Sequence, residues 1–322
     1  MHNFTFAFLE EQIKLKERIL ILTHTNPDGD AIGSLMAIRN IILEKGKTPS
    51  IFFSGKTSCN LKLEEESLIT KETHYNQYDL IIIVDTSNPK RTGIPIPSNL
   101  EELPETFIID HHLKKGGKIE YPKNIYYYIN PKATATCEII YDLLKKEEKF
   151  FSKETAYYLL LGIYTDSGGF FHSNTTPQLL KKTRDLLKMG VLFKNVTLNA
   201  FKGKNVRVLN YLGEKISDSK FNPELKFIFN TVKGLELAKK NISASDISGL
   251  VNLLNMCSDS IFSLLLFEEN NLIKGSFRSH EYKKIDVSHL SRFLGGGGHK
   301  LASGFEVPGK VVETYKKISI KN

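Results

Sequence analysis

The 322-residue sequence contains few cysteines and no long apolar run. Its three cysteines, Cys59, Cys137 and Cys257, are widely scattered, so their spacing favours neither a disulfide framework nor a thiolate metal site, and a reducing compartment fits best. No apolar stretch approaches the ~20 residues of a membrane-spanning helix. Residues 1–20 carry acids and bases from Glu10 onward, which is typical of an amphipathic helix and not of a signal peptide. We therefore expect a cytoplasmic protein.

The composition is that of a globular chain with an excess of basic side chains. Hydrophobic residues make up 41% and charged residues 25% of the sequence, which is normal for a protein that buries a core. The formal net charge of +8 favours anionic partners such as phosphates or nucleic acid, although coding bias toward lysine, isoleucine and asparagine explains it equally well. The length fits one large domain or two ordinary ones.

Strand-like and helix-like patterns alternate over the first 190 residues. Apolar runs of strand type occupy residues 18–23, 50–53, 80–85, 106–110 and, as a possible edge strand, 124–130. Helical spacing occupies residues 31–45, 133–146, 155–166 and 176–190. This alternation predicts an α/β domain at 1–190, with a mainly parallel sheet that helices flank on both faces.

A second, smaller α/β unit is expected at 223–322, after a more polar stretch at 191–222 that we interpret as a helical linker. Strand patterns occupy residues 226–232, 260–269 and 272–279, and the turn at 268–271 predicts a hairpin between the last two. Helices are expected at 243–256, capped near Ser243 or Ser245, and at 287–294. We expect a cleft between the two domains.

Aspartate and histidine side chains follow the predicted strands of the first domain. They lie directly after the runs ILIL, IIIV and FII, as His24, Asp28, Asp30, Asp85, Asp110, His111 and His112. Ligands of parallel α/β sheets gather outside the carboxyl ends of the strands, so these side chains should meet at one edge. Asp166 ends a helical segment beside the glycine pair of TDSGGFFH and should join them.

Six of these side chains are predicted to bind two divalent cations: His24, Asp28, Asp30, Asp85, His111 and Asp166. Four carboxylates in one apolar-walled crevice raise one another's pKa, and two divalent cations would neutralise them. Oxygen and imidazole donors without thiolate favour Mn²⁺, with Mg²⁺ or Co²⁺ as alternatives. Each acid alone has another interpretation as a turn or capping residue, but their common position in one domain favours the metal.

Within the predicted centre, Asp28 would serve one metal together with His24. Asp30 would serve the other metal, which His111 and Asp166 would complete. Asp85 would bridge the two.

The ordered motifs resemble those of a known superfamily. HTNPDGDAIGS, VD at 84–85, DHH at 110–112 and TDSGGFF are similar to the motifs of DHH phosphoesterases. GSFRS at 275–279 and IDVSHLSRFLGGGGHKLASGF at 285–305 resemble the DHHA1 domain. The closest resemblance is to the NrnA-like branch of nanoRNases and pAp phosphatases, which includes cyclic di-AMP and linear dinucleotide phosphodiesterases. It implies a DHH catalytic domain that binds two metals and a DHHA1 substrate-binding domain. Two positions depart from the family pattern: Phe171 stands where a basic residue is common, and Ser303 replaces a common alanine.

The glycine run before His299 has two interpretations. It is a flexible linker, or it lets backbone N–H groups approach an anion. The resemblance favours the second, with substrate contacts from Arg278, Ser279, Gly297, Gly298 and His299. Arginine can bind a phosphate through two parallel hydrogen bonds.

The expected reaction is the hydrolysis of short oligonucleotides or of dinucleotides such as cyclic di-AMP and pApA to mononucleotides, by a hydroxide held between the metals. His112 would contact the scissile phosphate or protonate the leaving oxygen, and Asp110 would orient the imidazoles. A pAp 3′-phosphatase is the alternative, and a non-catalytic RNA-binding protein is the alternative of another class. A DNA exonuclease and an inorganic pyrophosphatase fit less well, because little length is left over and GGGGH belongs to a different C-terminal unit. From the resemblance alone we expect a homodimer.

Overall fold

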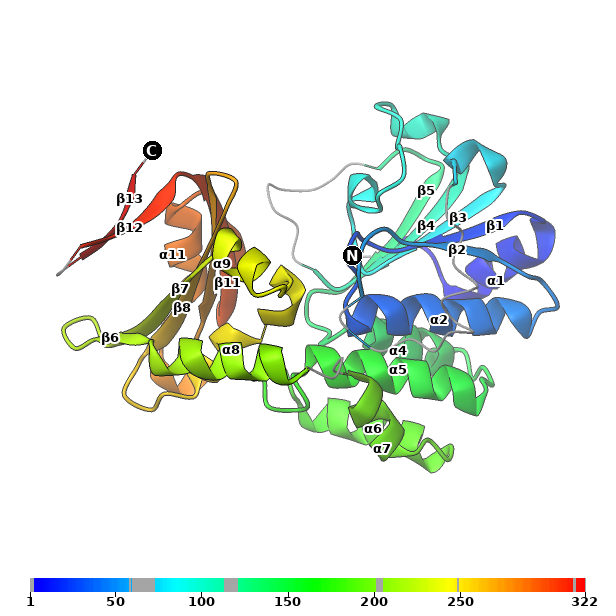
Figure 1. Ribbon diagram of the computed structural model, residues 1–322. Helices are drawn as coiled ribbons and strands as arrows, with labels where there is room; N and C mark the ends of the chain where they lie inside the picture. Colours follow the sequence, from blue (N-terminus) through cyan, green and yellow to red (C-terminus); the bar gives the residue numbers. More distant parts are fainter. Residues whose placement is uncertain are drawn as a thin grey trace. The chain divides into compact units, whose positions relative to one another are not determined.

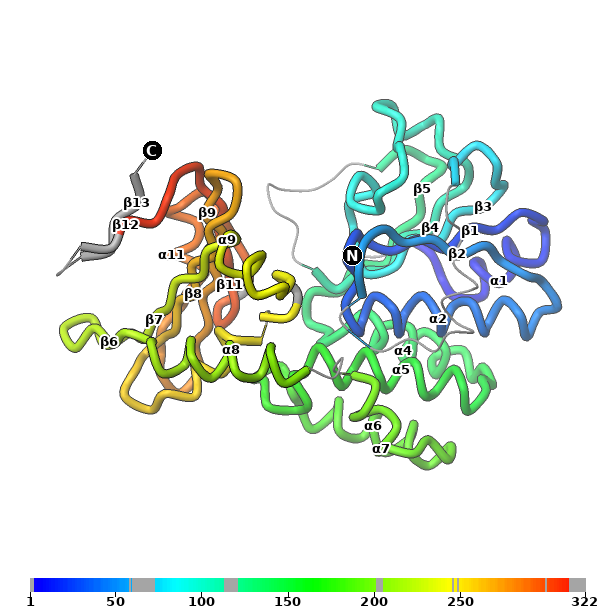
Figure 2. The backbone as a smooth tube through the Cα atoms, in the orientation of Figure 1, coloured from blue at the N-terminus to red at the C-terminus, as the bar shows by residue number. Residues whose placement is uncertain are grey.

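The computed structural model describes residues 3–57, 59, 73–112, 121–200, 205–247, 249–314 and 317–321. The chain divides into two compact units, Met1–Gly203 and Lys204–Asn322. Each unit has its own sheet and its own helices (Figure 1), and the backbone passes through the first unit before it enters the second (Figure 2). Within the described residues, no helix combines the length and the apolar character needed to cross a membrane.

The first unit is built on a parallel sheet in the order β2-β1-β3-β4-β5. Its strands are β1 (Ile19–Leu22), β2 (Ser50–Phe52), β3 (Leu80–Val84), β4 (Glu105–Asp110) and β5 (Ile125–Ile129). Every residue of β1 and β3 is buried, because both faces of a central parallel strand are covered. The direction of strand order changes at β1, so the carboxyl ends of β1 and β3 flank a topological switch point.

The two faces of this sheet have different covers. The α-helices that pack on one face are α1 (Phe6–Leu15), α2 (Gly29–Leu43), α4 (Thr136–Lys146) and α5 (Lys153–Asp166). In Figure 1, α2, α4 and α5 lie together on this face, and α6 (Pro177–Lys188) and α7 (Phe193–Ala200) pack against α5. On the opposite face the described residues form loops and single 3₁₀ turns at 75–77, 89–91 and 100–102. The helix-flanked parallel sheet is confirmed, although the described part of the second face carries no α-helix.

Helices α2 and α5 approach each other through glycines. A Cβ atom on Gly33 would lie 2.5 Å from the Tyr158 carbonyl oxygen, and one on Gly162 would lie 2.3 Å from Cys137 Sγ and 2.6 Å from Asp30 Oδ1. No larger residue fits at these positions without moving a neighbour. The close packing therefore fixes the start of α2 against the end of α5.

The second unit has a mixed sheet in the order β10-β11-β9-β8-β7-β6. Its strands are β6 (Lys220–Asn222), β7 (Phe227–Lys233), β8 (Phe262–Glu269), β9 (Leu272–Arg278), β10 (Gly297–His299) and β11 (Ala302–Pro308). Only β7 and β8 pair in parallel. The expected hairpin joins β8 to β9 through Asn270 and Asn271, whose φ angles of 51° and 60° suit a type I′ turn.

Helices and a short ribbon complete this unit. They are α8 (Val206–Ser217), α9 (Gly234–Lys239), α10 (Leu250–Asn255), α11 (Val287–Phe293) and the strand pair β12 (Lys310–Thr314) and β13 (Lys317–Lys321). Buried apolar clusters lie where α8 and α10 meet the sheet and around α11 and β11. The predicted separate C-terminal α/β domain is confirmed.

The segment 243–256 differs from the single helix expected there. The structure has a 3₁₀ turn at Ala244–Ile247 and then α10, whose N-cap is Gly249, and residue 248 lies outside the described residues. The Asp246 carboxylate accepts hydrogen bonds from the Ser243 N–H (2.9 Å) and hydroxyl (2.6 Å). These bonds resemble a capping box and place Ser243 as the cap of the 3₁₀ turn, as expected, whereas Gly249, a residue of low helix propensity, separates the turn from α10.

The stretch 191–222 holds two helices that belong to different units. Helix α7 packs on α5 of the first unit, whereas α8 packs on α10 of the second. The elements β6, α9, β10, β11, β12 and β13 were not expected from the sequence.

Candidate metal centre

Three neighbouring strands deliver polar side chains to one edge of the first sheet. His24 lies two residues after β1, Asp85 directly follows β3, and Asp110 ends β4. His111 and His112 follow Asp110. Because β1, β3 and β4 are adjacent and parallel, their carboxyl ends bring these groups together at the switch point.

The start of α2 adds two carboxylates to this edge. Asp28 is the N-cap residue, and its Oδ1 accepts the N–H groups of Asp30 and Ala31, both at 3.1 Å. Asp30 lies in the first helical turn and is fully buried. The sequence DGD therefore caps the helix, and this role does not exclude the predicted role of its carboxylates as metal ligands.

Asp85 stands at the centre of the cluster. Its side chain is buried, with Oδ2 3.4 Å from His24 Nε2 and Oδ1 3.6 Å from both His111 Nε2 and His112 Nδ1. Its φ of 61° is left-handed, a conformation that aspartate adopts more readily than most residues. The backbone bend turns the carboxylate away from the strand, so that its two oxygens face different imidazoles.

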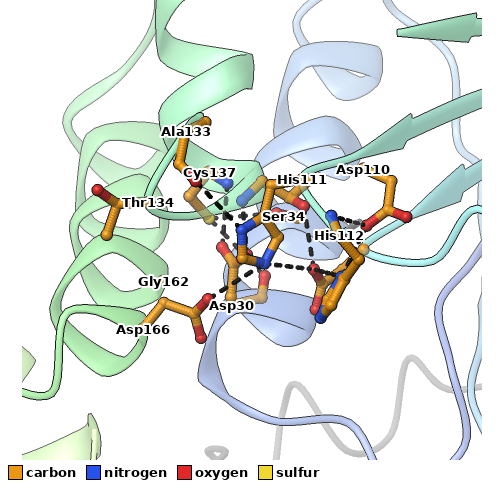
Figure 3. A network of polar contacts seen from close by, with 12 residues as sticks. Asp30, Ser34, Asp110, His111, His112, Ala133, Thr134, Cys137, Gly162 and Asp166 are labelled. Carbon is orange, nitrogen blue, oxygen red and sulfur yellow. Dashed lines mark hydrogen bonds and ion pairs between the residues drawn. The ribbon is translucent and has the colours of Figure 1, made fainter. Parts of the chain in front are cut away.

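His111 connects the centre to the two helices. Its Nε2 lies 3.2 Å from Asp166 Oδ2, at the end of α5, and 3.8 Å from Asp30 Oδ2. In Figure 3, Asp30 and Asp166 lie on one side of His111, and His112 and Asp110 lie on the other. His112 Nδ1 lies 2.8 Å from Asp110 Oδ1, which also accepts the His112 N–H at 3.1 Å.

The ligating atoms divide into three overlapping groups, each with its atoms within 4.8 Å of one another. The groups are His24, Asp28 and Asp85; Asp30, His111 and Asp166; and Asp85, His111 and His112. All six predicted ligands are present, and Asp85 belongs to two groups. The structure thus brings the predicted residues together, while their role as ligands stays a prediction. His112, expected to be catalytic, also lies within ligating distance.

The donor set fits divalent cations. Among the described residues, Asp85 Oδ2 is buried and has no hydrogen-bond partner, while buried His111 Nε2 has only ion-pair contacts, the shortest with Asp166, and none with hydrogen-bond geometry. A buried polar atom without a partner is costly, and a cation would supply the missing interaction. The donors are carboxylate oxygens and imidazole nitrogens, which suit Mn²⁺, Mg²⁺ or Co²⁺.

The charges in the cluster are strongly coupled. Burial raises the pKa of Asp85 well above its ordinary value, and the carboxylates of Asp30 and Asp28 raise it further. Burial also raises the pKa of Asp166 to about 7, although His111 opposes the shift. Burial disfavours the charged form of His111, but Asp166 outweighs it and raises the pKa of His111 to about 10. Without cations, the cluster would therefore hold protons in their place.

Asp110 behaves differently from Asp85 and Asp166. Burial alone would raise the pKa of Asp110, but its bonds to His112 outweigh burial and lower it. Asp110 therefore remains ionised and holds the His112 ring, as the predicted orienting role requires.

The predicted substrate contacts of the second unit are less uniform. Arg278 ends β9 and donates through Nε to Asn252 Oδ1 (3.0 Å) and through Nη1 to the Phe277 carbonyl (2.8 Å). Among the described residues it has no carboxylate partner, so its charge is available to an anion. Ser279 is buried and its hydroxyl donates to the Ile261 carbonyl at 2.7 Å, which is a role within the fold.

The glycine run is an ordered part of the sheet, so the alternative of a flexible linker is wrong. Gly297 and Gly298 lie in β10 and pair with Gly304 and Ser303 of β11. A Cβ on Gly298 would lie 2.6 Å from Ser303 Cα, and its φ of 138° also favours glycine. Part of the glycine requirement thus comes from strand packing. The side chain of His299 lies outside the described residues.

Sequence reasoning missed two residues that contact the centre. Both are at the start of α4, where the N–H groups of Thr136 and Cys137 donate to Asp30 (2.6 and 3.0 Å). The Thr136 hydroxyl donates to Asp85 Oδ1 at 3.0 Å. The available signal was a threonine at the start of a helix that follows a strand of the same sheet.

Comparison with known proteins agrees with the two-unit fold. Residues 18–163 match the DHH family, N-terminal domain, and residues 224–319 match the DHHA1 domain. The chain is 30% identical over 302 residues to the bifunctional oligoribonuclease and PAP phosphatase NrnA of Bacillus subtilis, covering 92% of this chain and 91% of that protein. It is 26% identical over 304 residues to the protein of the same name from Thermus thermophilus, covering 93% and 87%. An exopolyphosphatase-related protein from Bacteroides fragilis shares the fold, with a TM-score of 0.80, 24% identity, and coverage of 94% of this chain and 91% of that one.

Proposed function

The chain belongs to the NrnA-like DHH/DHHA1 family, and from this premise we propose that it is a metal-dependent phosphoesterase that hydrolyses short oligonucleotides or dinucleotides to mononucleotides. The names of its relatives support hydrolysis of short RNA and of pAp. Cyclic di-AMP and pApA belong to the proposal as further substrates of the same chemistry.

The shared carboxylate of Asp85 is the observation that carries the proposal. One group of ligating atoms joins it to His24 and Asp28, and another joins it to His111 and His112. The third group consists of Asp30, Asp166 and the same imidazole of His111. This arrangement suits two neighbouring cations better than one, and Mn²⁺ fits its donors well. When bound, the cations would offset the repulsion among the carboxylates, polarise the phosphoryl group and lower the pKa of coordinated water.

His112 and Asp110 would manage a proton beside these cations. Asp110 accepts a hydrogen bond at His112 Nδ1, which places the proton on that nitrogen and leaves Nε2 as the second position of the ring. The His112 side chain is 41% exposed, whereas that of His111 is 8% exposed, so a substrate phosphate reaches His112 more easily. We assign to His112 Nε2 the contact with the phosphate or the protonation of the leaving oxygen.

Arg278 would bind the substrate through a phosphate or a terminal nucleotide. Its guanidinium has neutral partners and no carboxylate partner among the described residues. Gly298 and the backbone of β10 would contribute N–H groups to the same anion, and His299 is included on the basis of the motif. Because this contact would exist before and during the reaction, it should govern affinity more than turnover.

A substrate panel tests the proposal. Purified protein with Mn²⁺ is incubated with cyclic di-AMP, pApA, pGpG, short RNA, pAp and pyrophosphate, and the rates are ranked. We expect turnover of at least one short nucleotide, little turnover of pyrophosphate, and loss of activity after exhaustive chelation. Activity that survives verified removal of all divalent metal would contradict the proposal. A fastest rate on pAp would favour the phosphatase alternative.

The RNA-binding alternative has its own test. A double substitution, Asp85→Ala with His111→Ala, removes at least one predicted ligand from each of the three groups of the proposed centre. If the protein only binds RNA, the variant should bind it as the wild type does, and the wild type should degrade nothing in the panel.

A further inference from the structure

The N-terminus of α4 contacts the two most deeply buried carboxylates among the predicted metal ligands, Asp30 and Asp85. The N–H groups of Thr136 and Cys137 donate to Oδ2 and Oδ1 of Asp30, at 2.6 and 3.0 Å. The Thr136 hydroxyl donates to Asp85 Oδ1 at 3.0 Å. Asp30, Thr136 and Cys137 are fully buried, and Asp85 is 1% exposed, so these bonds are shielded from water.

The local sequence explains why α4 accepts a carboxylate from another helix. Its N-cap residue is Ala135, which has extended backbone angles and provides no side-chain capping bond. The first N–H groups of a helix need acceptors, and alanine is a poor capping residue. Asp30 of α2 takes the place of the missing cap. The positive end of α4 also stabilises the buried negative charge of Asp30.

The hydroxyl of Thr136 acts on the other carboxylate. Thr136 donates a hydrogen bond to Asp85 from a neutral side chain. The ion-pair contacts of this carboxylate in the described part of the chain are with imidazoles, at 3.4–3.6 Å. The bond fixes Oδ1 on the side of His111 and His112. Asp85 Oδ2 then faces His24 and keeps no hydrogen-bond partner in the described part of the chain. A rotation of the carboxylate would break this division of its two oxygens.

We propose that Thr136 is a positioning residue of the metal centre, because its hydroxyl orients Asp85 while its N–H, with that of Cys137, anchors Asp30. One side chain and two backbone groups at the start of α4 would thereby set the spacing of carboxylates that come from β3 and α2. The inference rests on the proposed function, since it assumes that the cluster holds divalent cations. Groups that orient metal ligands in this way typically change metal affinity by about 10- to 100-fold when removed.

Two substitutions separate the hydroxyl from the rest of the residue. Thr136→Val has nearly the same shape, keeps both N–H donors to Asp30 and removes only the bond to Asp85. Thr136→Ser keeps the hydroxyl and removes the methyl group. A role in packing predicts that the serine variant is the more damaged, whereas a positioning role predicts that the valine variant is.

Thr106 offers a matched control. It is a fully buried threonine in β4 whose hydroxyl donates to the Pro104 carbonyl at 2.8 Å, at the opposite end of the strand from Asp110. Thr106→Val therefore makes the same chemical change in the same sheet without touching the centre.

The decisive measurement is Mn²⁺ binding to the full-length, metal-free protein by isothermal titration calorimetry, with thermal unfolding of each metal-free variant beside it. We expect Thr136→Val to lower the affinity for at least one Mn²⁺ ion by about tenfold or more. The Mn²⁺ affinities of Thr136→Ser and Thr106→Val should stay within about threefold of the wild-type value. Equal Mn²⁺ affinity of Thr136→Val and the wild type would overturn the inference, as would a serine variant as weak as the valine variant. If the wild type binds no Mn²⁺, Mg²⁺ or Co²⁺, the proposed function itself fails.

Discussion

Asp85 combines a left-handed backbone with a carboxylate shared between two groups of ligating atoms. The bend turns the side chain out of the direction of β3 and into the centre, where burial and neighbouring carboxylates disfavour its charge. A residue in this position needs both a tolerance for positive φ and two oxygens. Aspartate tolerates positive φ and has two side-chain oxygens, whereas asparagine tolerates positive φ but has only one side-chain oxygen.

Asp85→Asn should therefore keep the fold and lose the chemistry. Asparagine tolerates the φ of 61° and has the same size, so the metal-free variant should be at least as stable as the wild type. Loss of the shared ligand should reduce kcat/KM by more than about 100-fold, because removing groups that merely orient ligands already costs about 10- to 100-fold in affinity or activity. Calorimetric Mn²⁺ stoichiometry and steady-state rates measure the two effects. Retention of two tightly bound Mn²⁺ ions by the variant would contradict the bridging role.

Arg278→Ala should act mainly on KM. The guanidinium is proposed to bind a non-reacting phosphate, so its loss should raise KM by about tenfold while kcat stays within about twofold. Arg278→Lys keeps the charge but not the planar fork of donors, so its KM should lie between those of the wild type and Arg278→Ala. Unfolding midpoints serve as the control, because Arg278 also bonds Asn252 and Phe277. A fall in kcat with unchanged KM would be incompatible with the assigned role.

Among the elements, the pair α2 and α5 sets the position of Asp30 and Asp166. Their close approach depends on glycines. At Gly162, a Cβ atom would clash with the side chains of both Cys137 and Asp30. The helices therefore determine the spacing of ligands as directly as the strands do. The start of α4 adds to this arrangement through its bonds to Asp30.

Gly162→Ala tests this packing. The added methyl would lie 2.3 Å from Cys137 Sγ and 2.6 Å from Asp30 Oδ1, so a neighbour must move. We expect a loss of about 1–3 kcal/mol in the free energy of unfolding, and weaker Mn²⁺ binding because Asp30 shifts. Gly213→Ala in α8 is the matched control: nothing lies within 4 Å of the added methyl, so it should stabilise by about 0.5–1 kcal/mol. Urea unfolding of both variants compares them, and an unchanged Gly162→Ala protein would refute the argument.

The sequence predicts elements best where a single pattern determines them. The apolar runs of β1, β3 and β4 are buried on both faces, so they identified the strands and the edge at which His24, Asp85 and His111 meet. The segment 243–256 was harder, because its apolar periodicity does not reveal the interruption at Gly249, a residue of low helix propensity, between the 3₁₀ turn and α10. The role of Thr136 depends on which helix faces which, and no local pattern carries that information.

At the scale of the whole molecule, the chain has two units with separate cores, and the candidate metal centre lies entirely in the first unit. The six predicted ligands lie in the first unit, whereas Arg278 and the glycine run lie in the second. Among the described residues, each cluster of buried apolar residues is made up of residues from a single unit. Metal occupancy should therefore change the stability of the first unit and leave the core of the second unit as it is.

Metal removal should thus separate two unfolding transitions in calorimetry. A cation that binds only the folded state stabilises it by about 2.7 kcal/mol at a free concentration of 100 Kd, which corresponds to a shift of about 5–10 °C for a unit of roughly 200 residues. We expect Mn²⁺ to raise one transition by this amount and chelation to reverse it, while the other transition stays in place. Asp85→Asn is the control, because the transition of its first unit should respond less to Mn²⁺ than that of the wild type. Equal shifts of both transitions in the wild type, or an undiminished response in Asp85→Asn, would show that the stabilising ion binds elsewhere than between the carboxyl ends of β1, β3 and β4.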